Sequence, residues 1–402
     1  MTALESPAAW AASAALAADW TLVCSVCSAT AAPAGLPTVC PACSQPWLVR
    51  YPGRTHPPDA NAALGGGAGT PGQGMWRYRR FLPLLPGEEP VTLGEGGTPL
   101  LELERTGREL GLGRVWLKDE STNPTGSFKA RGLAMAVTRA VAGGAGSFVA
   151  PTAGNAGVAL SAYAARAGRP AKVFAPRTTP GTIVAQMLVF GADIELIDGH
   201  IGDCGRAARE YSARTGAFDV STLREPYRIE GKKTLGLELA EQLGWTLPDA
   251  VVYPAGGGTG LIGMWLAFAE LIAAGWVSGN PPRLFAVQSS GCAPVVRALE
   301  TGAERCEAWA EPWTIASGLR VPNPLGGALM LRAIRETRGG AVAVSDEALA
   351  DRAQAVSARE GVDLSPEGGA TVAAAAELVR RRLLGPEDRV VLFNTGAGWL
   401  YR

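Results

Sequence analysis

The chain is short of histidine, of net charge and of long apolar runs, and each shortage excludes a class of protein. Its 402 residues include two histidines, His56 and His200, and neither has partners at the spacing of a metal site or a catalytic triad. We therefore do not expect catalysis by histidine. Lysine plus arginine and aspartate plus glutamate both total 37, so no long-range field favours nucleic acid or an anionic membrane as a partner.

The N-terminal region lacks the features of a membrane span or a signal peptide. Residues 8–22 are apolar and rich in alanine, but Glu5 and Asp19 place charges near the ends of this segment and no basic segment precedes it. We expect residues 1–20 to form a loosely ordered arm and the protein to be cytoplasmic. Its seven cysteines are then expected to be thiols or metal ligands rather than disulfides.

Four of the cysteines form two closely spaced pairs. Cys24 and Cys27 make one Cys-x-x-Cys pair, Cys40 and Cys43 make another, and twelve residues separate the two. Two such turns can place four thiolates tetrahedrally around Zn²⁺, as in a zinc ribbon. A redox-active pair is the main alternative, but it would not need the second pair. Four sulfur ligands leave no open coordination position, so the predicted zinc has a structural role.

The remaining sequence alternates short β-rich segments with helical patterns. It follows a segment at 61–74, rich in Gly, Ala and Pro, that is interpreted as a linker or long loop. Strands are predicted at 115–118, 147–150, 171–175, 193–197, 251–254, 283–287, 341–344 and 389–393. Helical patterns lie between them, for example at 157–167, 182–190, 233–243 and 261–274. This alternation predicts an α/β fold with mainly parallel sheets, in two lobes with a cleft between them.

One lysine stands at a turn that suits covalent chemistry. The predicted strand 115–118 runs into a polar turn broken by Pro124 and Gly126, and the turn delivers Lys129 to the start of a helix expected near Arg131. A lysine in such a place can lower its pKa and form an imine with a carbonyl compound. The segment therefore indicates an enzyme that holds an aldehyde cofactor covalently.

Two loops of small residues follow predicted strands, where ligands bind in open α/β sheets. In the first, Asn155 offers an amide to a planar ring, and backbone N–H groups with the Thr152 hydroxyl can hold a carboxylate. The second loop ends at a helix N-terminus, where consecutive N–H groups make a site for a phosphate dianion. Its residues are Gly256, Gly257, Gly258, Thr259 and Gly260.

A third loop follows the final predicted strand. In it the neutral hydroxyl of Thr395 can meet a ring nitrogen. Taken alone, the first loop is better explained as a tight turn that needs glycine, and the third is equally well a chain-terminal turn. Together with Lys129, however, the three match what pyridoxal 5′-phosphate (PLP) needs, namely an amine, a phosphate cup, an amide and a hydroxyl.

These motifs resemble those of fold type II PLP enzymes, and among them the threonine synthase-like branch, over about residues 90–402. The matching segments are LGEGGTPL from Leu93, SFKARG from Ser127, TAGNAG from Thr152, EGKKT from Glu230, SPEGGA from Ser365 and NTGAG from Asn394. The resemblance implies a large PLP-binding lobe of residues 53–130 and 226–402 and a small α/β lobe of residues 131–225. It also implies a zinc ribbon at 21–52 and a possible homodimer.

The resemblance also implies roles for individual residues. Lys129 carries the imine link to PLP, Asn155 bonds the pyridine 3-hydroxyl and Thr395 faces the pyridine nitrogen. The segment 256–260 surrounds the phosphate. The small amino-acid substrate is expected to contact Ser127, Thr152, Ala153, Gly154 and Lys232.

The implied activity is that of threonine synthase, which converts O-phosphohomoserine and water to threonine and phosphate. Two departures keep other reactions open. Ala130 stands where the family usually has an acidic residue, and the loop AGGGTG at 255–260 looks more like that of serine/threonine dehydratases. A dehydratase giving a 2-keto acid, another β/γ-replacement, and a PLP-binding protein with little turnover are the alternatives.

Overall fold

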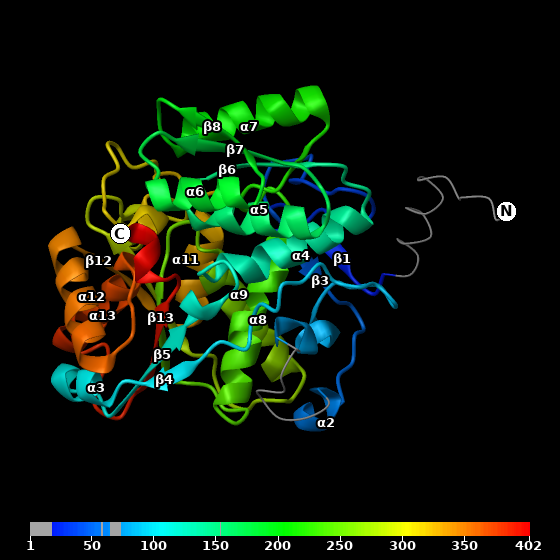
Figure 1. Ribbon diagram of the computed structural model, residues 1–402. Helices are drawn as coiled ribbons and strands as arrows, with labels where there is room; N and C mark the ends of the chain where they lie inside the picture. Colours follow the sequence, from blue (N-terminus) through cyan, green and yellow to red (C-terminus); the bar gives the residue numbers. More distant parts are fainter. Residues whose placement is uncertain (1–17, 58, 65–73, 153) are drawn as a thin grey trace.

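Two α/β lobes and a small N-terminal sheet make up the described part of the chain. The computed structural model describes residues 18–57, 59–64, 74–152 and 154–402. The smaller lobe is drawn in green at the top of Figure 1, and the larger lobe lies below it. The turn that precedes Lys129 lies where the two lobes meet.

A six-stranded sheet forms the centre of the larger lobe. Neighbouring strands are parallel except for the edge strand β4, which is antiparallel to β5. The side chains of each inner strand are buried on both faces: Val251 and Tyr253 of β10 lie in one apolar cluster, and Ala250 and Val252 lie in another. In spatial order the strands are β12 (Gly340–Val344), β11 (Arg283–Ser289), β10 (Ala250–Pro254), β13 (Arg389–Asn394), β5 (Arg114–Asp119) and β4 (Leu100–Glu102).

A four-stranded parallel sheet forms the centre of the smaller lobe. Its order is β8 (Asp193–Ile197), β7 (Ala171–Pro176), β6 (Phe148–Pro151) and β9 (Phe218–Asp219). The two sheets confirm the predicted α/β fold with mainly parallel strands. The limits of the lobes stay predictions, and helix α4 (Lys129–Ala142) crosses the limit drawn between residues 130 and 131.

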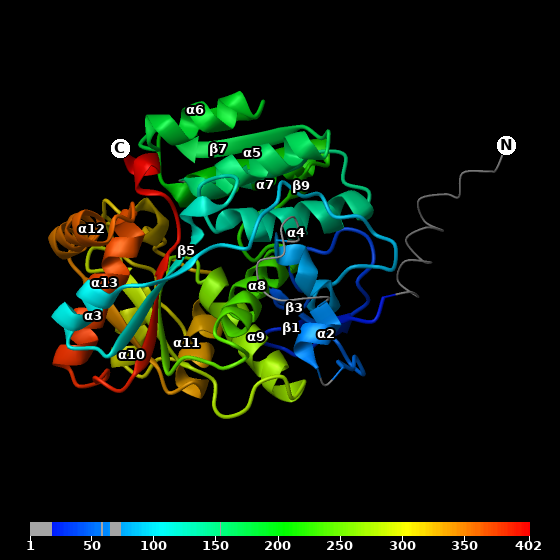
Figure 2. The same cartoon turned by 60° about the horizontal axis from the view of Figure 1, so that its bottom comes forward.

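Helices cover both faces of the two sheets. In the larger lobe α3, α12 and α13 share an apolar cluster on one face of the sheet, whereas α8 and α9 pack on the other (Figures 1 and 2). The α-helices beside α4 are α2 (Ala60–Leu64), α3 (Glu104–Leu110), α5 (Asn155–Arg166), α6 (Gly181–Val189), α7 (Ile201–Thr215), α8 (Tyr227–Gln242), α9 (Thr259–Ala273), α10 (Pro294–Glu300), α11 (Gly327–Glu336), α12 (Asp346–Glu360) and α13 (Pro366–Arg380). Short 3₁₀ turns are η1 (Gly74–Phe81), η2 (Glu120–Thr122), η3 (Ser317–Leu319) and η4 (Gly398–Tyr401).

Helix α8 differs most from its predicted range. The apolar pattern predicts a start at residue 233, but the helix begins at Tyr227. Every residue from Tyr227 to Glu241 is buried, the charged ones included. Because charged residues occupy its buried first turns, no apolar face marks them in the sequence, and the periodic pattern that reveals a surface helix is missing there.

Two predictions for the N-terminal part, the linker and the arm, differ from the structure where it describes these residues. Residues 61–64 of the expected linker belong to helix α2, so that part of the interpretation was wrong, and residues 65–73 lie outside the described residues. Of the expected arm, residues 1–17 lie outside them too, whereas Trp20 is buried in the core. Among the described helices none is long and apolar enough to span a lipid bilayer.

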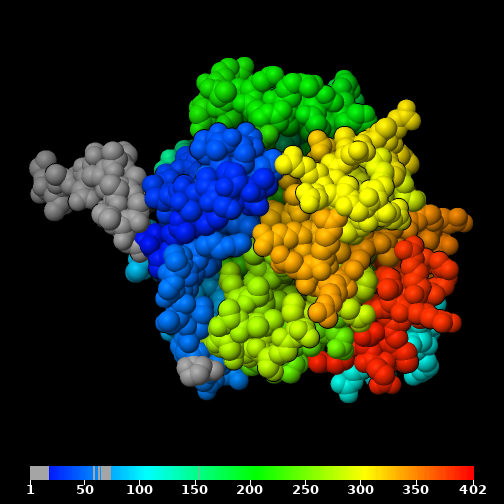
Figure 3. Space-filling model, turned by 180° about the vertical axis from the view of Figure 1, so that it is seen from behind, coloured from blue at the N-terminus to red at the C-terminus, as the bar shows by residue number. Residues whose placement is uncertain are grey.

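The small N-terminal sheet packs on helix α4. Its antiparallel order is β2 (Thr30–Ala31), β1 (Thr21–Cys24) and β3 (Trp47–Arg50). Leu22 and Trp47 share an apolar cluster with Leu133 and Val137 of α4. Figure 3 shows this sheet, in blue, on the back of the molecule beside the yellow segment that precedes α11. The sheet thus supports the helix whose first residue is Lys129.

Candidate active site

The turn before Lys129 is joined to the end of strand β13. The N–H of Phe128 donates to the carbonyl oxygen of Thr395 at 3.0 Å, and the N–H of Ala397 donates to the carbonyl oxygen of Gly126 at 2.9 Å. Strands β5 and β13 are parallel neighbours, so their carboxyl ends meet at one edge of the sheet. Two predicted site residues that are far apart in sequence, Lys129 and Thr395, therefore reach one place.

A cavity of about 510 Å³ opens at this edge of the sheet. It lies at the carboxyl ends of parallel strands, where ligands of open α/β sheets bind. Several segments contribute to its wall, among them Phe128, Lys129, Thr152, Gly154, Asn155, Gly256, Gly257, Gly258, Thr259, Gly260, Ser317, Glu367, Thr395 and Tyr401. The cavity thus collects the predicted amine, amide, hydroxyl and glycine loop.

The glycine loop presents unpaired N–H groups to the cavity. In the described part of the chain, the backbone N–H groups of Gly256, Gly257 and Gly258 have no acceptor. Gly258 has a φ of +74°, and a Cβ there would lie 2.1 Å from the sulfur of Met330. The loop leads into α9 at Thr259, whose N-terminal dipole adds partial positive charge. Together these donors fit a phosphate dianion.

The amine of Lys129 has a lowered pKa. Burial and, to a smaller extent, the nearby Arg228 lower the pKa to about 7, while the carboxyl group of Glu367 opposes the shift. The amine lies 4.2 Å from the centre of the Phe128 ring. A large share of the amine is therefore neutral near pH 7, and the neutral form is the nucleophile.

Asn155 and two residues that the sequence analysis missed form a polar group in the same cavity. The Asn155 Nδ2 donates to the Tyr401 hydroxyl at 3.2 Å, while the buried Asn155 Oδ1 has no partner. Glu367 accepts from the N–H of Gly318 at 2.8 Å, and burial raises its pKa. Burial and the neighbouring Glu367 raise the pKa of Tyr401 well above its usual value. Glu367 lies in the SPEGGA motif, which was a usable signal, whereas no motif marked Tyr401.

The other expected substrate contacts divide into two groups. Thr152 and Gly154 line the cavity, and Ala153 lies outside the described residues. Ser127 is fully buried, and its hydroxyl accepts from the N–H of Lys129 at 3.4 Å. Lys232 is fully buried too, and its amine donates to the carbonyl oxygen of Phe128. Neither Ser127 nor Lys232 is part of the cavity wall.

Three arginines that sequence analysis did not single out line the cavity instead. Arg209 comes from α7, Arg224 from the loop before α8, and Arg320 from the loop after η3. Within the described residues none of the three forms an ion pair with a carboxylate. Glu367 is the one acidic residue in the described wall of the cavity. The wall therefore carries an excess of positive charge apart from the glycine loop.

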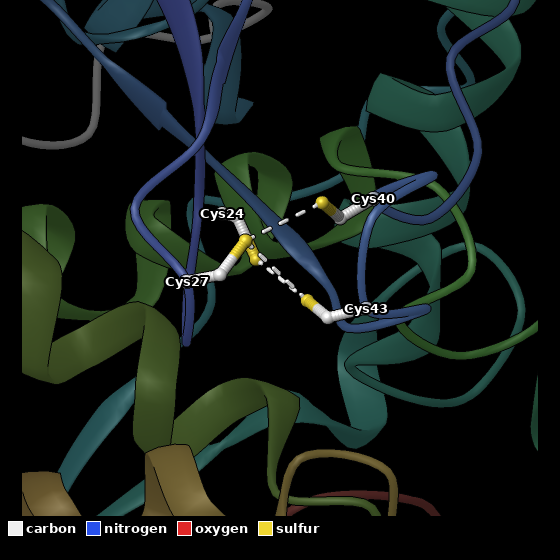
Figure 4. A group of neighbouring side chains, drawn as sticks. All are labelled: Cys24, Cys27, Cys40 and Cys43. Carbon is white, nitrogen blue, oxygen red and sulfur yellow. Dashed lines mark hydrogen bonds between the residues drawn. The ribbon is translucent and has the colours of Figure 1, made fainter.

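The four N-terminal cysteines lie together, as predicted (Figure 4). Their sulfur atoms all lie within 4.8 Å of one another, with 3.3 Å between Cys24 and Cys43 and 3.7 Å between Cys27 and Cys40. Four thiolates at about 2.3 Å from a tetrahedral Zn²⁺ would be about 3.8 Å apart. The arrangement fits a four-coordinate metal site.

Comparison with known proteins identifies the family. The chain belongs to the pyridoxal-phosphate dependent enzyme family, whose model matches residues 91–396. Threonine synthase from Methanosarcina acetivorans is 34% identical over 324 residues, covering 80% of this chain and 79% of that protein. Threonine synthase from Mycobacterium tuberculosis is 34% identical over 325 residues, covering 80% and 86%.

A solved structure supports the same conclusion about the fold. An L-serine ammonia-lyase from the fungus Rhizomucor miehei is 25% identical, with a TM-score of 0.63 over 75% of this chain and 93% of that chain. These findings confirm the predicted fold type II architecture and the resemblance to threonine synthases. The chain is a PLP-dependent lyase and a homologue of threonine synthases.

The residues of the cavity fit PLP. The free N–H groups of the glycine loop suit its phosphate, and the unpaired Oδ1 of Asn155 suits a hydroxyl or oxygen substituent on its ring. Lys129, with its lowered pKa, is the amine in the cavity wall that can bond the aldehyde. Thr395 offers a neutral hydroxyl in the cavity wall directly after β13, and β13 is the sheet neighbour of β10, the strand that leads into the glycine loop.

Proposed function

We propose that the protein is a threonine synthase, which converts O-phosphohomoserine and water to threonine and phosphate. Its relatives with this activity match about four-fifths of the chain. The observation that carries the choice of substrate is the set of three arginines without carboxylate partners in the cavity wall. A substrate with a phosphate group needs a second anion site beside the cofactor phosphate, and arginine suits this because its planar fork bonds phosphate oxygens in pairs.

The residues would divide the work as follows. Lys129 would hold the cofactor and, once released by the substrate amine, would move the proton at the substrate Cα. Asn155 would orient the cofactor ring, the segment 256–260 would anchor its phosphate, and Thr395 would face the ring nitrogen without protonating it. PLP, when bound, supplies the electron sink for carbanion chemistry.

The substrate itself would be held by a second set of contacts. Thr152 and Gly154 line the cavity next to Asn155, and we assign them to the substrate carboxylate. Arg209, Arg224 and Arg320 would bind the substrate phosphate, in place of the Lys232 and Ser127 contacts expected from sequence. Phe128 would help to exclude water from the reacting atoms, since its ring is buried beside Lys129.

One observation favours a second candidate, a serine/threonine dehydratase. The loop at 255–260 has the AGGGTG sequence typical of those enzymes, and the L-serine ammonia-lyase of Rhizomucor miehei shares the fold. In that reaction the β-hydroxyl leaves and a 2-keto acid results. Serine and threonine carry a carboxylate but no phosphate group, so this reaction does not explain the three arginines in the cavity wall.

The test uses the purified enzyme loaded with PLP. We expect phosphate release with formation of threonine from O-phosphohomoserine, and little keto acid from serine or threonine. Keto acid without any phosphate release would support the dehydratase. Lys129→Ala is expected to abolish turnover and the visible absorption of covalently bound cofactor, and turnover unchanged in that variant would contradict the role of Lys129.

A matched pair of arginine variants tests the substrate site. Arg224→Ala is expected to raise the KM for O-phosphohomoserine by about 10-fold or more, since a charge-assisted hydrogen bond contributes about 1.5–3 kcal/mol. Arg177→Ala is the control, because Arg177 is exposed in the same lobe and pairs with Asp198. An unchanged KM in Arg224→Ala would remove the argument for a phosphorylated substrate.

We also propose that Cys24, Cys27, Cys40 and Cys43 bind one structural Zn²⁺. Four thiolates close the coordination shell, so the metal would stabilise the ribbon and take no part in the reaction. A homodimer and a cytoplasmic location stay predictions.

A further inference from the structure

Lys232 carries a buried amine that has no carboxylate partner. Its side chain is fully buried in α8, and in the described residues no carboxylate lies within ion-pair distance of its amine. Burial and the nearby Lys129 lower its pKa well below the usual value. An apolar side chain would be easier to bury at this position, so the amine needs another explanation than packing.

The amine of Lys232 contacts the residue before Lys129. It donates to the carbonyl oxygen of Phe128 and lies 4.0 Å from the centre of the Phe128 ring. The amine of Lys129 lies 4.2 Å from the same ring centre. Phe128 is also the residue whose N–H bonds Thr395. Lys232 thus holds the carbonyl group of the peptide bond between Phe128 and Lys129.

Close packing of helices α4 and α8 brings Lys232 to this point (Figures 1 and 2). A Cβ on Gly132 of α4 would lie 2.8 Å from the Cε of Lys232, and a Cβ on Gly231 would lie 2.1 Å from the carbonyl oxygen of Arg131. Only glycine at both positions leaves the space for the lysine to pass beneath the first turn of α4. Gly132 belongs to the SFKARG motif and Gly231 to EGKKT, so one contact joins the two motifs.

We propose that Lys232 is a positioning residue, which fixes the backbone at Phe128 so that the amine of Lys129 meets the cofactor aldehyde. The proposal rests on the proposed function only in that Lys129 is the amine that bonds PLP. Loss of the Lys232 amine leaves the Phe128 carbonyl free to shift, and small displacements of a reacting group slow a reaction strongly.

The neighbouring Lys233 is a matched control. It is as deeply buried on the same helix, but its amine pairs with Glu230 at 2.8 Å and with Glu270 at 2.7 Å. It also lies 4.5 Å from the ring centre of Tyr51, beside the N-terminal sheet. Lys233→Met therefore removes an equally buried amine that has no contact with Phe128.

The experiment measures how fast the apoprotein captures PLP covalently, from the growth of visible absorption after mixing. Lys232→Met is expected to slow capture at least about 10-fold. The affinity for pyridoxine 5′-phosphate, which has the phosphate but no aldehyde, should stay within about twofold. Gly132→Ala provides a second route, because its methyl group displaces the lysine without removing it, and it should slow capture in the same way.

The outcomes are distinct. Capture by Lys232→Met at the wild-type rate would overturn the proposal, as would an equal slowing in Lys233→Met. If Lys232→Met does not fold, Gly132→Ala takes its place. Slower capture in Gly132→Ala than in Lys233→Met would support the proposal, and capture at the wild-type rate in Gly132→Ala would overturn it. Failure of the wild-type protein to capture PLP would count against Lys129 itself, and so against the proposed function.

Discussion

The N–H of Phe128 donates to the carbonyl oxygen of Thr395, and this bond helps to join the turn before Lys129 to the end of β13. It fixes the residue before the reactive amine against the residue expected to face the cofactor ring nitrogen. The two belong to segments that follow β5 and β13, neighbouring strands in the sheet but distant in sequence. The geometry of the site is therefore as rigid as the sheet edge on which it is built.

Covalent capture of PLP should depend on pH through the amine of Lys129. Its pKa of about 7 means that the amine is protonated and unreactive below pH 7 and neutral above it. The capture rate of the apoprotein is expected to rise about tenfold per pH unit below 7 and to level off above it. In Glu367→Gln the midpoint should move to lower pH, because the carboxyl group that favours the protonated amine is gone. A midpoint near pH 10 in the wild-type protein would refute this prediction.

A methyl group at Gly258 of the glycine loop should weaken binding of the cofactor phosphate. Gly258 and Gly275 have φ values of +74° and +72°, but a Cβ on Gly258 would overlap Met330, whereas a Cβ on Gly275 would meet nothing within 4 Å. Both alanine variants incur the strain of left-handed backbone, about 1–2 kcal/mol. Only Gly258→Ala should also weaken binding of pyridoxine 5′-phosphate, measured by titration. Equal affinities in the two variants would argue against a phosphate site at Gly258.

Removal of zinc should destabilise the protein. The ribbon packs on α4, so its unfolding would expose Leu133 and Val137 as well as its own core. Elemental analysis is expected to find one zinc per chain, and Cys40→Ser is expected to lose the metal and to lower the unfolding temperature. Cys204→Ser is the control, since Cys204 is a buried cysteine on α7 that does not belong to the four-cysteine cluster. Protein free of zinc with an unchanged unfolding temperature would contradict the assignment.

The buried charges behind the site should be needed for stability. The guanidinium of Arg131 lies 2.7 Å from Glu120 and 2.8 Å from Glu238, and all three side chains are buried. Arg131→Met would leave Glu120 without its cation, so we expect a loss of about 3–5 kcal/mol in the free energy of unfolding. Arg177→Met, which breaks an exposed pair, should lose under about 1 kcal/mol. Denaturant titration distinguishes the two, and similar losses would contradict the prediction.

Much of the fold could be predicted because its signals are local. The eight predicted strands lie within one or two residues of the observed ones, since buried parallel strands have continuous apolar sequences between turn residues. The early start of α8 could not be predicted, because its first turns bury charged residues and so show no apolar periodicity. Strand β9, with two residues, is too short to carry any pattern.

The sequence by itself determined the chemistry that depends on short motifs. Lys129, the glycine loop and the two cysteine pairs are each specified within a few residues, because a turn, a helix N-terminus or a metal knuckle is a local structure. Only the tertiary structure decided what surrounds them. It placed Lys232 behind Phe128, brought Arg209, Arg224 and Arg320 to the cavity, and set Tyr401 beside Asn155. A side chain's electrostatic and hydrogen-bond partners come from distant segments, and sequence spacing contains no information about which segments fold against it.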